Sequence, residues 1–335
     1  MNEVTRAEEI SNIAFGFMAS KALFVALHCN IFTLLSKNPM NSEKLSKMTA
    51  IPENRISTIC TALTSIGLLN RKDQIYYNSK GAEKFLVKGS EKDFGDYLRF
   101  QIDRQMYGFM GQLENVITGK DSNIDIDSYA KWMENEEEAN IYSKSQHAGS
   151  IGPGKTLSKI IDFSKYKNML DVAGGTGAFA IELCKKYPSL TVQILDFSNV
   201  IKIGKTKVME ERLSDRISFI EADALEYNWP KDNDIILMSY LFNGVPGEEI
   251  PKLISNAYNN LNNNGILIVH DFMVKMDRSG PHLAALWQLQ HLAFTPMAKS
   301  ITSEWIFKLM SRSGFKNIKK SDLIPDMTKI VWGKK

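Results

Sequence analysis

The chain has 335 residues, of which 44% are hydrophobic and 24% are charged, as in an ordinary soluble globular protein with room for two domains. Its formal net charge of +3 argues against nucleic acid or a membrane surface as a partner. Three scattered cysteines without a CxxC pair suit a reducing compartment and offer no metal site. Because no signal-like apolar core opens the chain and no run approaches the ~18 apolar residues of a membrane span, we expect a cytoplasmic protein.

The first third of the chain predicts three helices followed by a hairpin. An amphipathic helix covers residues 19–35, a second helix follows with Ser42 as its N-cap, and a third begins at Pro52 and ends at Gly67. Residues 68–77 then form a small hairpin around a Lys72-Asp73 turn. This order of elements is a winged-helix pattern.

A winged helix could read DNA. Its third helix, however, carries a single basic residue, Arg55, whereas phosphate contacts need several Lys or Arg side chains. Dimerisation or a scaffold role is therefore the favoured function of residues 1–95.

Residues 96–150 have a helical pattern rich in aromatic side chains, among them Tyr107. We expect a helical connector that contributes to a substrate pocket, although packing in a core would also explain the aromatics. The glycine- and proline-rich stretch 149–154 is predicted to break the helix just before a sheet domain that covers residues 151–335.

A glycine-rich turn opens that domain. A short apolar run ends on Asp171, and the chain continues as Val172-Ala173-Gly174-Gly175-Thr176-Gly177 into a helical pattern. Strand, glycine turn and helix present backbone N–H groups to a ligand, but any tight turn can use glycine, and the spacing is not the Gly-x-Gly-x-x-Gly of dinucleotide enzymes. A second acid, Asp196, ends the next strand-like run 19 residues after Gly177, near the offset at which an acid meets ribose hydroxyls.

Further short apolar runs predict strands at 217–220, 234–238 and 266–269, separated by helices at about 200–213 and 247–261. A helix at 305–312 precedes two last strands, 315–320 and 327–332, whose connection is too short for a helical crossover, so they must be antiparallel. We predict an α/β fold: a seven-stranded Rossmann-like sheet whose last strand pair is antiparallel, as in S-adenosylmethionine (SAM) methyltransferases, plus the N-terminal helical winged-helix domain.

The sequence resembles the small-molecule O-methyltransferases of plants and of bacterial natural-product pathways. The resemblance covers nearly the whole chain and implies a homodimer formed through the N-terminal domain, SAM as cofactor and S-adenosylhomocysteine as product. It implies that Ala173 stands where the family has the first glycine of its turn, an exchange that should be tolerated if φ is negative. The cofactor-binding residues that it implies are Tyr142, Asp171, Ala173, Gly174, Gly175, Gly177, Asp196, Phe197, Asp223, Ala224, Met238 and Ser239.

One departure from the family concerns the base. The family usually carries a His-Asp pair after the fourth strand, and its His deprotonates the acceptor hydroxyl. Asn243 and Gly244 stand at these positions, and an amide is no general base near neutral pH. Three interpretations follow. The acceptor is nucleophilic enough to react without a base, or another group of the protein acts as the base. The third is that methyl transfer has been lost in favour of a non-methylating reaction.

Among the five histidines, His147 is the preferred substitute base and His291 the next, while Asn243 would orient the acceptor. The chain is also similar to bacteriochlorophyllide C-20 methyltransferase, which lacks the same His and shares a Tyr142-x-x-x-x-His147 pattern; this favours C-methylation. Tyr107, Phe242, Trp287 and His291 are the candidate substrate-binding residues.

We therefore predict a SAM-dependent methyltransferase that acts on an oxygen or carbon of a small aromatic, polyketide or tetrapyrrole-like molecule, without nucleic acid, membrane or metal. The alternatives are a SAM-binding catalyst of a hydroxylation or pericyclic reaction and, from another class, a winged-helix regulator that senses a ligand.

Overall fold

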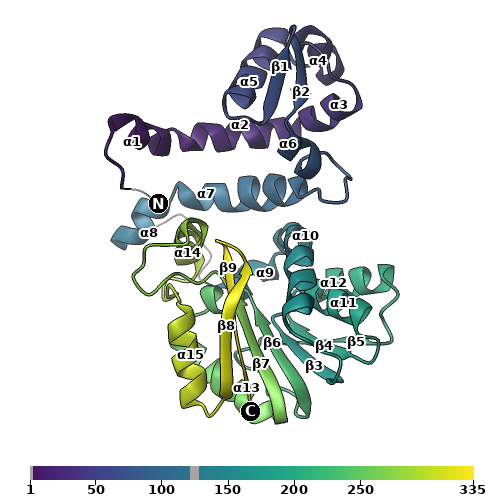
Figure 1. Cartoon of the computed structure of the whole chain (residues 1–335), viewed down its shortest axis with the longest axis vertical. Coiled ribbons are helices and arrows are strands. Elements are labelled where there is room, and N and C mark those ends of the chain that lie inside the picture. Colours follow the sequence, from purple (N-terminus) through teal and green to yellow (C-terminus); the bar gives the residue numbers. More distant parts are fainter. Residues whose placement is uncertain (1–2, 121–127) are drawn as a thin grey trace. The chain divides into compact units, whose positions relative to one another are not determined.

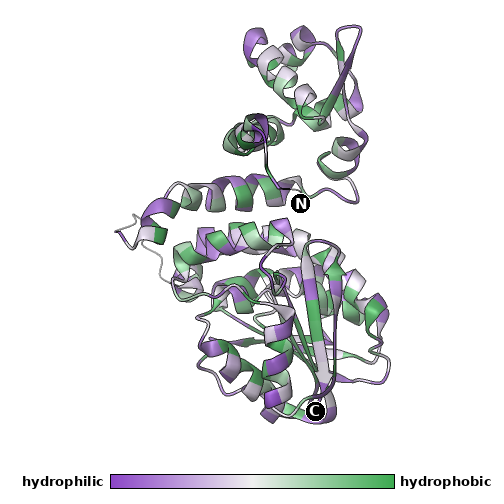
Figure 2. Ribbon diagram, turned by 60° about the vertical axis from the view of Figure 1, so that its left-hand side comes forward, coloured by the Kyte–Doolittle hydropathy of each residue, from purple (hydrophilic) through white to green (hydrophobic). Residues whose placement is uncertain are grey.

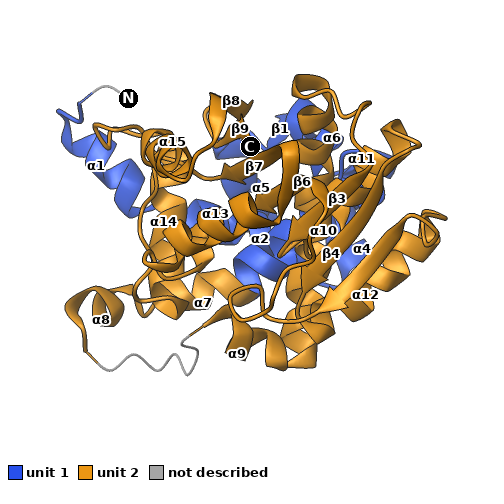
Figure 3. Cartoon of the chain, turned by 90° about the horizontal axis from the view of Figure 1, so that it is seen from below, with its two compact units in different colours: residues 1–104 blue, residues 105–335 orange. Residues whose placement is uncertain are grey.

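The computed structural model describes residues 3–120 and 128–335. The chain divides into two compact units, unit 1 (residues 1–104) and unit 2 (residues 105–335), coloured blue and orange in Figure 3. The sequence-based division at residues 95 and 150 remains a prediction.

Unit 1 consists of small helices and one hairpin, followed by a helix that crosses the unit boundary. Its elements are α1 (Ala7–Ala14), α2 (Gly16–His28), α3 (Ile31–Lys37), α4 (Ser42–Thr49), α5 (Glu53–Ser65), β1 (Leu69–Lys72), β2 (Ile75–Asn78), α6 (Lys80–Phe85) and the π-helix Tyr97–Met106. The hairpin β1–β2 is antiparallel, as predicted, and a buried cluster that includes Phe32, Ile56, Leu63 and Tyr76 forms the core.

Two details of unit 1 differ from expectation. The helix predicted over residues 19–35 is interrupted between α2 and α3, because Asn30 adopts the left-handed conformation with φ 56°, which an α-helix cannot include. The N-cap of α4 is Asn41 rather than Ser42: the Asn41 side chain accepts a hydrogen bond from the Lys44 N–H at 2.9 Å.

The N-terminal helices expose an apolar surface. Residues Ala7–His28 form the one segment, within the part of the chain that the structure describes, that is long and apolar enough to cross a membrane, with a mean hydropathy of 1.6 in its most apolar window. The expectation that no apolar run approaches this length is therefore wrong, because it considered only uninterrupted runs. The side chains concerned are the exposed Ile10, Ile13, Phe15, Phe17 and Met18.

Unit 2 is a sheet covered by helices on both faces (Figure 1). Its helices are α7 (Tyr107–Met110), α8 (Leu113–Thr118), α9 (Tyr129–Glu134), α10 (Glu136–Ile160), α11 (Ala178–Lys186), α12 (Ser198–Glu210), the 3-10 turn Phe242–Gly244, α13 (Glu249–Asn260), α14 (His282–Phe294) and α15 (Ser303–Arg312). Its strands are β3 (Asn168–Val172), β4 (Thr191–Asp196), β5 (Ile217–Glu221), β6 (Asn233–Ser239), β7 (Leu261–Asp271), β8 (Lys316–Ile324) and β9 (Thr328–Lys334).

The sheet has the order β5-β4-β3-β6-β7-β9-β8. Strands β3 to β7 pair in parallel, and β9 is antiparallel to both β7 and β8, which confirms the predicted fold. Helices α10 to α12 pack on one face and α13 and α15 on the other, each over its own buried cluster. Strands in the middle of the sheet carry apolar stretches, green in Figure 2, as expected of strands covered on both faces, whereas the edge strand β8 is mostly polar and exposed.

The predicted break at residues 149–154 is wrong, because helix α10 runs through this stretch with Pro153 inside it. Gly154 faces α11: a Cβ atom there would lie 3.3 Å from the Cα atom of Phe179. The glycine therefore permits close approach of two helices rather than ending one, and α10 extends without interruption over the carboxyl ends of the strands.

Candidate active site

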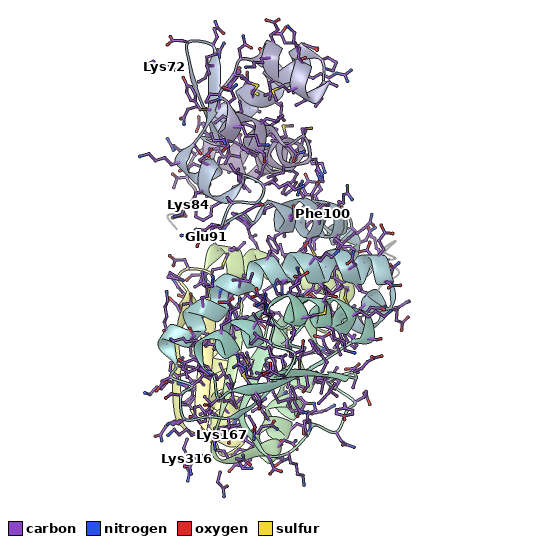
Figure 4. The ribbon with its side chains drawn as sticks, turned by 90° about the vertical axis from the view of Figure 1, so that its right-hand side faces the viewer. Lys72, Lys84, Glu91, Phe100, Lys167 and Lys316 are labelled. Atoms are coloured by element: carbon purple, nitrogen blue, oxygen red, sulfur yellow. The ribbon has the colours of Figure 1, made fainter. Side chains whose placement is uncertain are left out.

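A cavity of about 240 Å³ lies in unit 2 at the carboxyl ends of the parallel strands, where open α/β sheets bind ligands. Each of β3, β4, β5 and β6 contributes residues at or just after its end, while α9, α10 and the turn after β6 supply the remaining walls. Lys167 and Lys316, labelled in Figure 4, lie at the opposite, amino edge of the sheet.

The turn after β3 forms one wall. Gly177 has φ 80°, and a Cβ atom there would lie 2.6 Å from Ile194 Cδ1, so only glycine can stand at this position without movement of its neighbours. Ala173 has φ 54°. The negative φ on which its tolerance was predicted is therefore absent, and Ala173 holds the left-handed conformation that the family's glycine would adopt more easily.

Asp171 ends β3 inside the cavity and carries an unusual carboxyl group. Its side chain is 1% exposed, and neither of its oxygen atoms has a hydrogen-bond partner among the described residues. Burial raises the pKa of Asp171 to about 8, and the neighbouring Asp196 carboxylate adds to the increase. Ser143 Oγ, also buried in the cavity wall, is likewise unpartnered. Buried polar groups of this kind need a partner, and a ligand with an ammonium group would provide one.

Asp196 ends β4 and fixes the glycine turn. Its Oδ2 accepts a hydrogen bond from the Gly175 N–H at 2.7 Å, and its Oδ1 accepts one from the Phe197 N–H at 2.7 Å. Burial raises the pKa of Asp196 to about 6, although these two backbone donors oppose the increase. Asp223, after β5, lines the cavity and accepts a hydrogen bond from the Leu225 N–H at 2.8 Å. Three carboxyl groups thus face one cavity.

Asn243, at the position of the expected base, belongs to a buried hydrogen-bond network. It is 0% exposed, and its Nδ2 donates to Asp271 Oδ1 at 2.6 Å and to the Phe272 carbonyl at 2.9 Å. Gln288 Nε2 donates to Asn243 Oδ1 at 2.7 Å. The amide thereby fixes the turn whose next residues, Gly244 and Val245, line the cavity.

The structure brings ten of the predicted site residues into the cavity wall: Tyr142, Asp171, Ala173, Gly174, Gly175, Asp196, Phe197, Asp223, Ala224 and Ser239. Eight others lie outside the lining: Gly177, Met238, Asn243, His147, Tyr107, Phe242, Trp287 and His291. Of these, five adjoin lining residues in the chain (Gly177, Met238, Phe242, Asn243 and His147), and Tyr107 begins the half-buried helix α7. Trp287 stacks on Phe272, with ring centroids 4.8 Å apart.

The two candidate base histidines differ in their surroundings. His147 Nδ1 is 2.7 Å from Thr176 Oγ1, and burial lowers the pKa of His147 to about 4. His291 is 4% exposed, and its Nδ1 lies 3.5 Å from the hydroxyl of Tyr129, which lines the cavity. Burial lowers the pKa of His291 to about 3. Both imidazoles are therefore neutral near pH 7.

Several cavity residues were not chosen from the sequence, among them Tyr129, Ser143, Gln146, Leu225 and Thr295. Helical spacing could have found two of them, since Gln146 lies four residues after Tyr142 on α10 and Thr295 four residues after His291, just beyond α14. Tyr129 was one of many aromatics in its segment, and nothing in its local sequence distinguishes it.

The family of the chain follows from comparison with known proteins. Residues 121–316 match the O-methyltransferase domain, and residues 11–88 match the O-methyltransferase dimerisation domain. The chain therefore belongs to the SAM-dependent O-methyltransferase family and is an enzyme of that family.

Individual relatives are distant. The 3-hydroxy-5-methyl-1-naphthoate 3-O-methyltransferase of Streptomyces sahachiroi is 24% identical over 85% of this chain and 83% of its own length. The L-tyrosine C(3)-methyltransferase of Streptomyces lavendulae is 23% identical over 92% and 86%. Human N-acetylserotonin methyltransferase, solved in complex with SAM, superposes with a TM-score of 0.85 at 20% identity over 100% of this chain and 99% of its own. This last similarity shows a shared fold.

Proposed function

We propose that the protein transfers a methyl group from SAM to an oxygen or carbon of a small, flat, largely apolar molecule, such as an aromatic, polyketide or tetrapyrrole-like compound, without a histidine base after β6. The observation that carries the proposal is the buried carboxyl group of Asp171 at the end of β3, which has no hydrogen-bond partner among the residues that the structure describes. It adjoins the glycine turn, and Asp196 stands at the end of the neighbouring strand.

The residues that line the cavity suit SAM as a cofactor. When bound, SAM supplies an electrophilic methyl group on a sulfonium. Asp171 and Ser143 would meet the amino-acid part of the cofactor, Asp196 the ribose hydroxyls, and Phe197 and Asp223 the adenine. The three carboxyl groups also favour a ligand that carries positive charge.

The turn after β6, which carries Asn243, bears on how the acceptor reacts. Asn243 is locked by Asp271 and Gln288, so its part is to fix the turn that carries Gly244 rather than to take a proton. Alignment of acceptor and methyl group supplies much of the rate in such a site. Because relatives include both an O- and a C-methyltransferase by name, the atom methylated remains open between oxygen and carbon.

We also propose a cytoplasmic homodimer formed through unit 1. The match to the dimerisation domain and the exposed apolar side chains of α1 and α2, such as Ile13 and Phe17, support it. A second copy that covers these side chains would remove them from water.

Calorimetry tests the proposal that SAM is the cofactor. The wild-type protein should bind SAM and S-adenosylhomocysteine, and Asp196→Ala should weaken both by at least tenfold, whereas Asp215→Ala, an exposed aspartate outside the cavity, should not. Unchanged affinity in Asp196→Ala would contradict the assignment of SAM as the cofactor.

Incubation with methyl-labelled SAM and an extract of the producing cells then tests the reaction. Turnover of a small molecule without transfer of label would favour the non-methylating alternative.

A further inference from the structure

A buried histidine that the proposed chemistry does not use lies directly behind the cavity wall. His270 belongs to β7 and is 0% exposed. Its Nδ1 atom lies 2.8 Å from the Oγ atom of Ser239, the last residue of β6, which lines the cavity. Its Nε2 atom has no hydrogen-bond partner among the residues that the structure describes. Within that part of the chain, the imidazole is therefore hydrogen-bonded to the cavity wall and to nothing else.

The imidazole is held in place by strand pairing and by aromatic side chains. Ser239 stands opposite His270 in the register of β6 and β7. The centroid of the imidazole lies 4.4 Å from that of the Tyr240 ring and 5.5 Å from that of the Phe179 ring, and both of these residues line the cavity. Because the ring is buried against these neighbours, its Nδ1 atom stays beside the serine.

Ser239 shares a face of the sheet with Asp171. Asp171 pairs with Leu237 across β3 and β6, and side chains two residues apart on one strand point to the same face. Ser239 therefore lies one step further toward the carboxyl end of the same face. This is the end of the cavity that we propose holds the amino-acid part of the cofactor.

The protonation state of His270 sets the direction of its hydrogen bond. Burial lowers the pKa of His270 to about 3, so the imidazole is neutral near pH 7 and carries one hydrogen. A hydrogen on Nε2 would leave a buried N–H group without a partner, which is rarer in proteins than a buried acceptor without one. The hydrogen therefore belongs on Nδ1, which donates to Ser239 Oγ. The serine hydroxyl then keeps its own hydrogen for another acceptor.

The charges around the cavity call for such a donor. Among the described residues that line it, three are acids (Asp171, Asp196 and Asp223), and none is Lys, Arg or His. The amino-acid part of SAM carries an ammonium group, which the acids suit, and a carboxylate, which finds no cationic partner in this wall and needs neutral donors instead. A hydroxyl whose oxygen already accepts a hydrogen bond is a stronger donor, because hydrogen bonds in a chain polarise one another.

We infer that His270 is a positioning residue, whose Nδ1–H holds the Ser239 hydroxyl so that this hydroxyl donates its hydrogen to the carboxylate of the cofactor. The inference rests on the proposed function, because it takes SAM as the ligand of the cavity. Ser239 contacts the cofactor, and His270 acts through Ser239.

Two ligands that differ by one carboxylate test the inference: S-adenosylhomocysteine and decarboxylated S-adenosylhomocysteine. In calorimetry, the wild type should bind the first roughly tenfold or more tightly than the second, the factor that a hydrogen bond to a charged group supplies. Ser239→Ala and His270→Leu should each reduce this preference roughly fivefold. The double variant should reduce it no further, because the two residues act in series. His270→Asn, which keeps an N–H donor near the position of Nδ1, should restore most of the preference.

A control variant and a spectroscopic measurement accompany the calorimetry. His282→Leu, at an exposed histidine that begins α14 outside the cavity lining, should leave the preference unchanged. Nitrogen-15 NMR of the wild type locates the imidazole hydrogen of His270, with its signals assigned through correlation with the backbone. A hydrogen on Nδ1 is expected. A hydrogen on Nε2 overturns the inference, whether or not the His270 variants fold.

The outcomes separate this inference from the proposed function. Failure of the wild type to bind S-adenosylhomocysteine contradicts the proposed function. If S-adenosylhomocysteine binds no more tightly than its decarboxylated analogue, the role of Ser239 is wrong while SAM stands as the cofactor. A full preference in His270→Leu, or losses that add up in the double variant, overturns the role of His270. Melting temperatures close to that of the wild type establish that each variant is folded.

Discussion

The two ends of the cavity are built in different ways. At the end formed by the strand termini, which we propose holds the cofactor, Asp171 ends β3 and Asp196 ends β4. At the end formed by helices, which we propose faces the acceptor, the contacts join helices far apart in the sequence, as Tyr129 and His291 do across 162 residues. The first end depends on a local turn, and the second depends on how α9, α10 and α14 pack.

This difference predicts different responses to substitution. A change at the cofactor end should alter binding of a charged ligand by a large factor, because few groups carry the interaction. A change at the acceptor end should alter either the choice of acceptor or the stability of the packed network. Three substitutions follow, in order of decreasing effect.

Asp171→Asn should weaken binding of SAM by roughly 30- to 160-fold, since it removes a buried charge partner worth ~2–3 kcal/mol. The same substitution should stabilise the protein without cofactor. The pKa of Asp171 is raised from 3.8 to about 8 in the folded protein, so the native state binds this proton more tightly than the unfolded chain. Stability is then lost as the pH rises from about 4 to 8, and a neutral amide avoids that loss.

Calorimetry and thermal melting at pH 6 and pH 8 measure both effects. Asp215→Asn, at an exposed aspartate, is the control for a change of charge alone. Strong SAM binding by Asp171→Asn would show that the unpartnered carboxyl group has no part in the cofactor site.

Asn243→His tests whether the lost base could simply be restored. The amide is 0% exposed and makes hydrogen bonds to Asp271, Phe272 and Gln288, so a larger ring should break them. Burial raises the pKa of Asp271 to about 7, against the effect of its donors, which include Asn243, so the loss of those donors would leave a buried acid poorly paired. We expect the free energy of unfolding to fall by ~2–4 kcal/mol, without a gain in methylation of hydroxyl groups.

Denaturant unfolding measures the loss, with Asn259→His on the exposed face of α13 as the matched control. A stable Asn243→His protein that methylates hydroxyls far faster than the wild type would mean that only the base is missing. That result would place the catalytic proton acceptor at the turn after β6.

The same contrast explains what could be predicted from the sequence. The sheet and the acids at its strand ends could be predicted from the sequence, because apolar runs, the glycine turn and the short connection between the last two strands each constrain the backbone locally. The break predicted at residues 149–154 was wrong because close packing of Gly154 on α11 overrides the usual effect of glycine and proline. Tyr129 was not selected because its place in the cavity wall depends on packing against Gly244 and Phe294, which lie far away in the chain.

Ala173→Gly should produce the smallest effect, and two opposing terms set its sign. The left-handed conformation at φ 54° costs a residue with a Cβ atom roughly 1–2 kcal/mol. Glycine removes this cost but gives the unfolded chain more freedom, which costs ~0.4–1 kcal/mol. The balance favours glycine by about 0.5–1 kcal/mol. Ala50→Gly is a matched control, because Ala50 has φ 56° at the end of α4, in unit 1. Both variants should melt at a slightly higher temperature, while SAM affinity changes by less than about threefold. A clear loss of SAM affinity in Ala173→Gly alone would show that the methyl group of Ala173 contacts the cofactor, and that the cofactor end depends on side-chain packing as well as on its turn.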